Sequence, residues 1–302
     1  MVVPISTGYS DINVPKINAG KMRNKGFEVS VSSRNLEGEF SWDTSLNASY
    51  NKNEIIRLNG DVPMYFDNNI HSVGHPVSSF YGYVTNGIFQ TQEEVDRYAI
   101  QTQGNDPYNR TSAGDIRFKD LNNDGVINDK DRTYLGNPTP TWIFSMNNSF
   151  AWKGFDLAAA FQGVYGNEIL NLERRYLLNM EASSNMMRES LQRYPYGELN
   201  RATRKSSGNN GACTSTFHLE DGSYLRLQNL SLGYTFPDKW TRRAGISKLR
   251  IYVQGSNLFT WTDYSGYNPE VNKRAADALR PGEDYCSYPL SRTFSVGINF
   301  NL

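Results

Sequence analysis

The chain has 302 residues, with 31 Lys and Arg against 31 Asp and Glu, so its formal net charge is zero. A balanced charge argues against a nucleic-acid partner, because contact with the phosphate backbone requires a basic face. Hydrophobic residues are only 38% of the chain and the mean hydropathy is -0.60. No stretch approaches the ~20 apolar residues of a membrane-spanning helix.

The composition is polar yet rich in aromatic residues, with 19 Tyr, 15 Phe and 5 Trp. Disordered chains are poor in aromatic residues, so we expect a folded protein. This profile is typical of an extracytoplasmic β-protein or of a membrane barrel wall, in which lipid-facing and lumen-facing residues alternate. The amino-terminal residues do not follow the pattern of a signal peptide. We therefore expect either a cytoplasmic protein or a piece of a longer chain.

Long runs of alternating hydrophobicity dominate the sequence. In residues 142–152, large apolar side chains occupy one face, apart from Asn148, and mostly small or polar side chains occupy the other, as a half-buried strand requires. A tilted strand of this length rises roughly 23 Å, which is close to the apolar band of a bacterial outer-membrane barrel. Trp142 and Trp152 would then lie at the two membrane interfaces, where aromatic residues gather.

The same pattern predicts an all-β, antiparallel protein with long strands at 26–35, 40–50, 142–152, 155–165, 224–236, 248–261 and 292–302. The links alternate between short ones (36–39, 153–154, 237–247) and long ones (55–141, 171–222, 262–291). Short periplasmic turns and long outer loops are the organisation of an outer-membrane barrel. Such barrels need an even number of strands and no open edge, so the sequence predicts a segment of a larger barrel.

The long loop 55–141 contains a sequence similar to a calcium loop, DLNNDGVINDKD at 120–131. Oxygen ligands would come from Asp120, Asn122 and Asp124, from the carbonyl of Val126, and from Asp131 at the twelfth position. The twelfth residue is usually Glu, so the affinity for Ca²⁺ would be modest. The alternative is an Asx-rich turn whose side chains cap their own backbone.

Two further features leave alternatives open. Trp261, Tyr264 and Tyr267 begin the last long loop, where their rings would either form the interfacial girdle and loop core or stack on a sugar or peptide. Cys213 and Cys286 form either one bridge or two thiols. No catalytic arrangement of Ser, His or paired carboxylates is evident, so we expect no enzyme and no catalytic residue.

Five segments together carry a family resemblance. They are NKGFE at 24–28, GDIRFKDLNNDG at 114–125, LGNPTP at 135–140, DGSYLRLQNLSLGY at 221–234 and GSNLFT at 255–260. In this order they resemble the carboxyl-terminal part of the SusC/RagA family of TonB-dependent outer-membrane transporters. The resemblance covers nearly the whole chain.

The resemblance implies a barrel of about 22 strands, of which this chain would supply about seven along residues 1–302. The plug domain and signal peptide would lie outside this chain. It further implies the outer membrane of a Gram-negative bacterium, active import of glycans or peptides, a SusD-like surface lipoprotein as partner, and coupling to TonB through the missing amino-terminal region. The alternative is a secreted, calcium-stabilised β-protein that binds carbohydrate.

Overall fold

The structure is a computed structural model that describes residues 20–101, 110–178, 185, 187–188, 213–273 and 279–301. It is dominated by one antiparallel sheet of seven strands in the order β1-β2-β9-β10-β13-β14-β16. Their bounds are Lys21–Leu36, Phe40–Arg57, Trp142–Trp152, Phe155–Tyr165, Tyr224–Thr235, Lys248–Thr262 and Thr293–Asn301. Each of the seven predicted strands is confirmed. β1 and β2 are longer than expected, so the first long loop begins after Arg57.

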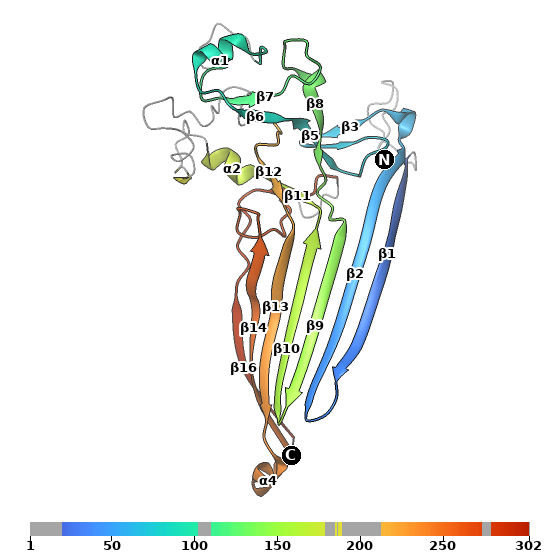
Figure 1. Ribbon diagram of the computed structural model, residues 1–302, viewed down its shortest axis with the longest axis vertical. Coiled ribbons are helices and arrows are strands. Elements are labelled where there is room, and N and C mark those ends of the chain that lie inside the picture. The colour runs from blue at the N-terminus through green and yellow to red at the C-terminus, as the bar shows by residue number, and fades with distance from the viewer. Residues whose placement is uncertain are drawn as a thin grey trace, which may run out of the picture.

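The strands form a single curved wall, and nearly all other elements lie at one of its ends (Figure 1). At that end the first loop contains β3 (Met64–Phe66), β4 (Asn69–His71), β5 (Ser79–Tyr83), β6 (Thr85–Ile88), α1 (Gln92–Arg97), β7 (Ile116–Phe118) and β8 (Arg132–Gly136). The second contains β11 (Glu168–Asn171), α2 (Leu172–Leu177) and β12 (Leu219–Asp221), and the third contains β15 (Glu283–Asp284). The opposite end has short turns and α4 (Asp238–Thr241). Long and short connections therefore separate as predicted.

The register gives the wall two chemically different faces. One row of paired residues crosses all seven strands and is entirely apolar: Leu36, Trp42, Phe150, Leu157, Leu232, Val253 and Val296. Another row is small or polar throughout: Ser32, Ser45, Asn147, Ala160, Asn229, Ser256 and Thr293. We call the surface with the first row the outer face and the surface with the second row the inner face. A one-residue slip in any strand would exchange the two, so this pattern fixes the register.

The outer face is not covered within the described residues. On β16, for example, Phe294 is 76% exposed and Val296 is 75% exposed. Among the buried apolar residues that the structure describes, three belong to the wall, and all three lie near its loop end: Ile55, Tyr224 and Leu227. The compact apolar cores are instead in the loops, around Phe80 with Leu170 and Leu172, and around Ile116 with Phe118 and Ile127. A wall with an uncovered apolar face requires an apolar surrounding.

Aromatic rings gather at both ends of the outer face. Near the loops, the ring centroid of Trp142 lies 5.6 Å from that of Phe27 and 5.0 Å from that of Tyr50. Near the turns, Trp152 lies opposite Phe155, and Phe155 packs 4.6 Å from Tyr234. The two tryptophans therefore occupy opposite ends of the apolar face, as the sequence predicts. No helix within the described residues is long and apolar enough to cross a membrane.

Candidate functional site

The three long loops are joined through backbone pairing. β11 pairs with β12 and also, in parallel, with β15, which connects the second loop to the third. The first loop joins them where the Tyr83 amide donates to the Thr214 carbonyl at 2.9 Å and the Thr216 amide donates to the Tyr83 carbonyl at 3.1 Å. A Cβ atom on Gly82 would lie 2.0 Å from that Thr214 carbonyl oxygen. Glycine at this position permits the close approach of the first two loops.

The Asn68 side chain connects all three loops. Its Nδ2 donates to Oε1 of Glu283 in the third loop at 2.7 Å, and its Oδ1 accepts from the Thr214 hydroxyl of the second loop at 2.6 Å. Glu283 is fully buried. An unmatched carboxylate at such a position costs several kcal/mol, so its hydrogen bond with Asn68 stabilises the assembled loops. We call this arrangement of Asn68, Thr214 and Glu283 the three-loop junction.

A second polar network holds the third loop against the second. The Glu220 carboxylate accepts from the Arg174 guanidinium at 3.2 Å, from the Ser265 amide at 2.8 Å and from the Ser265 hydroxyl at 2.9 Å. Nearby, the Tyr264 hydroxyl donates to the buried Asp284 carboxylate at 2.5 Å. Burial, followed by the hydrogen bond to Asp284, raises the pKa of Tyr264 well above its usual value, so this hydroxyl stays protonated and remains a donor.

The third loop also folds back onto the inner face of the wall. The Arg226 guanidinium, in β13, is almost buried and forms an ion pair with Glu270 and a 2.8 Å hydrogen bond with the Asn268 amide oxygen. The Tyr224 hydroxyl donates to the same Glu270 carboxylate at 2.5 Å. Burial raises the pKa of Glu270, but the hydrogen bonds from Tyr224 and Arg226 outweigh it and hold this pKa below its usual value. Glu270 is therefore charged at neutral pH and anchors the loop.

Asn68, Thr214 and Glu283 of the three-loop junction line part of an open cavity of about 440 Å³ between the loops. Its charged lining consists of Asp67, Asp129, Glu283, Arg132, Arg175 and Lys273. The cavity is also lined by the rings of Tyr83 and Tyr176 and by the thiol of Cys213. Volumes of this order are typical of small-molecule sites. The cavity therefore has the size and polarity to receive a small charged or polar group.

The calcium-like segment lies away from this cavity wall, except for Asp129. The Asp120 carboxylate accepts from the Gly125 amide at 2.8 Å, and the Asn122 and Asp124 side chains accept from amides two residues onward. Asp131 is fully buried and accepts from the amides of residues 121, 122 and 128. The turn that the sequence offered as the alternative is thus formed. Within the described residues, no group of three or more His, Cys, Asp or Glu side chains is arranged to hold a metal ion.

Four of the five predicted ligands, Asp120, Asn122, Asp124 and the carbonyl of Val126, belong to exposed or half-buried residues of the loop. Val126 is exposed, its amide donates to the Asp124 carboxylate at 3.0 Å, and its carbonyl accepts from the Asn128 side chain at 3.3 Å. Asp131 fits a metal least well, since both its oxygens are occupied and buried. Calcium at 120–131 stays a prediction.

The aromatic residues that begin the third loop separate into two groups. Trp261 is exposed and stacks on Phe259, with ring centroids 6.1 Å apart. Tyr264 belongs to the loop core through Asp284, whereas Tyr267 is 72% exposed.

Cys213 and Cys286 are thiols, which decides between the two states left open by the sequence. Sequence reasoning missed Asn68, Thr214 and Glu283, because isolated residues of these types in separate loops form no recognisable spacing.

Comparisons with known proteins agree with this architecture. The sequence profile described as "TonB dependent receptor-like, beta-barrel" matches residues 2–258. TonB-dependent receptor P3 of Formosa agariphila is 34% identical over 96% of this chain and 30% of its own length. TonB-dependent receptor P26 of the same organism is 30% identical over 99% of this chain and 31% of its own length. TonB-dependent receptor SusC of Bacteroides thetaiotaomicron is 24% identical over 98% of this chain and 28% of its own length.

The fold matches solved structures as well. The structure of the RagAB peptide transporter superposes with a TM-score of 0.75 at 22% identity and covers 99% of this chain and 31% of that one. The RagAB peptide importer in its "open-open" state gives a TM-score of 0.69 at 23% identity, over 94% of this chain and 29% of that one. This chain spans about a third of the length of the relatives that it matches. The sheet has an apolar and a polar face, and its long loops lie at one end. The chain belongs to the TonB-dependent receptor β-barrel family, as the resemblance of its motifs to SusC/RagA predicts.

Proposed function

We propose that this chain forms part of the wall and the external loops of an outer-membrane, TonB-dependent importer of glycans or peptides. The observation that carries the proposal is the pair of register rows, apolar on the outer face and polar on the inner face, across all seven strands. A lipid-facing apolar band with a hydrated lumen accounts for both. Import, rather than catalysis, is the activity implied by relatives that are named receptors.

The long loops belong to the external vestibule in this proposal. Buried apolar cores and polar networks hold the described parts of these loops together, and the cavity opens among them. A SusD-like surface lipoprotein would cover this vestibule, and TonB would act through a region outside this chain. Glycan and peptide remain two candidate substrate classes, because the RagAB neighbours are described as peptide transporters whereas their likeness to this chain is one of fold.

Membrane insertion is tested by a matched pair of substitutions in the intact outer-membrane protein that contains this chain. Leu46 points to the outer face of β2, where it pairs with Val31 and with Met146 halfway along β9, and its neighbour Ser45 belongs to the inner-face row. A lysine in the middle of the lipid-facing band costs about 2–4 kcal/mol, whereas one in a hydrated lumen costs little. We expect Leu46→Lys to lower recovery from the outer-membrane fraction sharply and Ser45→Lys to leave it unchanged. Equal recovery of both variants, or a parental protein that stays in solution without detergent, would favour the secreted alternative.

Transport is tested separately in cells with and without a functional TonB. Fluorescently labelled oligosaccharides and oligopeptides, each too large for a porin, are supplied to cells that produce the intact protein or lack it. Import requires uptake of at least one class that depends on both the protein and TonB. Uptake that persists without TonB contradicts active import. Co-purification of a surface lipoprotein from the same membranes tests the predicted partner.

A further inference from the structure

The charges around the loop cavity are not evenly matched. Asp67 forms a 2.9 Å ion pair with Arg280, and Asp129 lies 3.7 Å from Arg132. The third carboxylate, Glu283, accepts a hydrogen bond from the neutral Asn68 amide. Two of the three carboxylates that line the cavity are therefore paired with arginines, and the third is hydrogen-bonded.

Two cations that line the same cavity lack an anionic partner among the described residues. Within the described residues, neither Arg175 of α2 nor Lys273 of the third loop forms an ion pair or a side-chain hydrogen bond. The Lys273 ammonium instead lies over the Tyr285 ring, 4.4 Å from its centroid. Arg175 is half-buried, so its guanidinium has lost part of its hydration without gaining an acceptor. A partly dehydrated cation without a partner favours an incoming anion.

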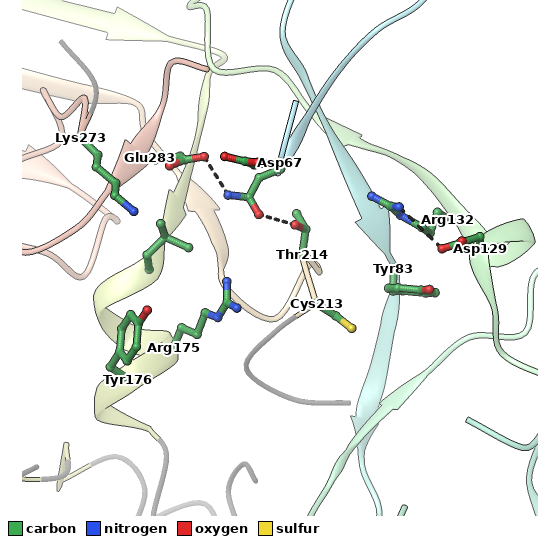
Figure 2. Close-up of a pocket in the computed structure, with 12 residues that line it drawn as sticks. Asp67, Tyr83, Asp129, Arg132, Arg175, Tyr176, Cys213, Thr214, Lys273 and Glu283 are labelled. Carbon is green, nitrogen blue, oxygen red and sulfur yellow. Dashed lines mark hydrogen bonds and ion pairs between the residues drawn. The ribbon is translucent and has the colours of Figure 1, made fainter. Parts of the chain in front are cut away.

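The position of these groups suits one shape of anion. Arg175 and Lys273 approach the cavity from two different loops, with Tyr176 beside Arg175 (Figure 2). A guanidinium presents a planar fork of donors that matches a carboxylate, and an ammonium adds a compact charge. The Tyr176 ring, which meets Tyr285 at a centroid distance of 5.5 Å, offers an apolar surface for the carbon skeleton next to that carboxylate.

We propose that this cavity binds the carboxylate group of an acidic solute, with Arg175 and Lys273 as its ligands. The inference rests on the proposed import function, since it assigns a chemical class to the solutes that enter the vestibule. A uronic-acid unit of a glycan and the carboxyl terminus of a peptide are two sources of the same group. Neutral oligosaccharides and peptide amides lack it.

Cys213 lies in the cavity wall between Arg175 and Tyr83 and provides a direct reporter (Figure 2). In the intact protein with Cys286→Ser, Cys213 is the remaining thiol of this chain. Its rate of modification is measured with an anionic and with a cationic methanethiosulfonate reagent, and each rate is normalised to the reaction of the same reagent with 2-mercaptoethanol. Two neighbouring cations are expected to favour the anionic reagent by about tenfold. Arg175→Gln with Lys273→Gln is expected to bring the ratio close to one.

A matched control removes two cations of the loops that lie outside the cavity wall. Arg97 and Lys119 are exposed residues of the first loop, and Arg97→Gln with Lys119→Gln should leave the reagent ratio unchanged. Each single variant, Arg175→Gln and Lys273→Gln, is measured as well, in case the double variant does not fold. A ratio near one in the parental protein overturns the proposal, as does an equal fall in the ratio in the control.

Protection of Cys213 distinguishes the two sources of the carboxylate. Trigalacturonate is compared with neutral galactotriose, and trialanine with trialanine amide. We expect at least one acid to slow modification about fivefold while its neutral counterpart does not, and the acid that protects identifies the source. Absence of protection by both acids overturns the proposal, whatever the reagent ratio. The labelling does not depend on uptake, so its failure leaves the import proposal standing, and failure of import leaves the labelling result standing.

Discussion

Arg250 of β14 reaches across β13 to form a two-pronged ion pair with Asp156 of β10. Its Nε and Nη2 atoms lie 2.9 Å and 2.5 Å from the two carboxylate oxygens. Gly233 lies between them on the inner face, and a Cβ atom there would come within 2.6 Å of both partners. The absence of a side chain at Gly233 thus allows two strands that are not neighbours to be linked.

Gly233→Ala is predicted to break this link and to lower the free energy of unfolding by about 1 kcal/mol, the value of a well-aligned but partly solvated ion pair. Urea unfolding of the intact protein in lipid vesicles measures the change. Ser231→Ala, on the same face of the same strand, is the control. A double-mutant cycle with Asp156→Asn must show coupling, and strictly additive effects would contradict the proposed role of Gly233.

Asn148 is the polar exception on the outer face, and the structure explains how it is accommodated. Its Oδ1 accepts from the Trp42 indole at 3.1 Å and from the Thr44 hydroxyl at 2.8 Å. Asn148→Leu should destabilise the wall by about 1–3 kcal/mol, because it leaves the indole N–H without an acceptor in an apolar surrounding. Trp42→Phe in the same protein should restore most of the lost stability. If Trp42→Phe adds a further loss instead, the indole contact is not the cause.

The Glu270 anchor predicts that the third loop loosens in acid. Because the pKa of Glu270 is lowered in the folded loop, its contribution is fully present above the unfolded value of about 4.3 and is lost as the pH falls through the lower folded value. Hydrogen exchange at residues 263–273 should therefore rise below about pH 4 in the parental protein. Glu270→Gln should show fast exchange already at pH 7. Exchange that is identical in the two proteins at pH 7 would exclude this anchor.

Because Asn68 contacts both other long loops, we predict that a substitution at Asn68 increases hydrogen exchange in all three loops together. Asn68→Asp replaces the donor to Glu283 with a second negative charge, so it should weaken all three loops. Hydrogen exchange in β15 and at residues 213–218 is expected to increase by at least tenfold, while β9 and β10 remain protected. Asn86→Ala, an exposed position of the same loop, is the control. A change confined to the first loop would show that Asn68 does not connect the three.

Calcium binding at 120–131 can be tested through the same kind of local readout. If the ion binds, Ca²⁺ should slow proteolysis of the first loop in the parental protein, and Asp120→Ala or Asp124→Ala should remove that protection with little effect on the strands. Terbium luminescence gives an independent measure of occupancy. Equal proteolysis with and without Ca²⁺ would show that the segment is only a self-capped turn, as its hydrogen bonds to its own backbone permit.

The sequence by itself determined the wall. Alternation with period two places Trp142, Met146 and Phe150 on one face whatever their partners, because successive side chains of a strand point in opposite directions. The turn at 153–154 is equally local: Lys153 and Gly154 both adopt positive φ, 47° and 88°, the geometry of a tight hairpin. The motif resemblance then identified the family from the same printed residues.

Only the tertiary structure decided how the loops assemble and what they enclose. Asn68 is 146 residues from Thr214 and 215 residues from Glu283 in the sequence. No local sequence pattern therefore predicts that these three side chains contact one another. The cavity and its two unmatched cations depend on those long-range contacts. Strand alternation is fixed by the geometry of single residues, whereas a site formed between loops depends on the packing of distant segments, and the sequence expresses that packing only once the chain has folded.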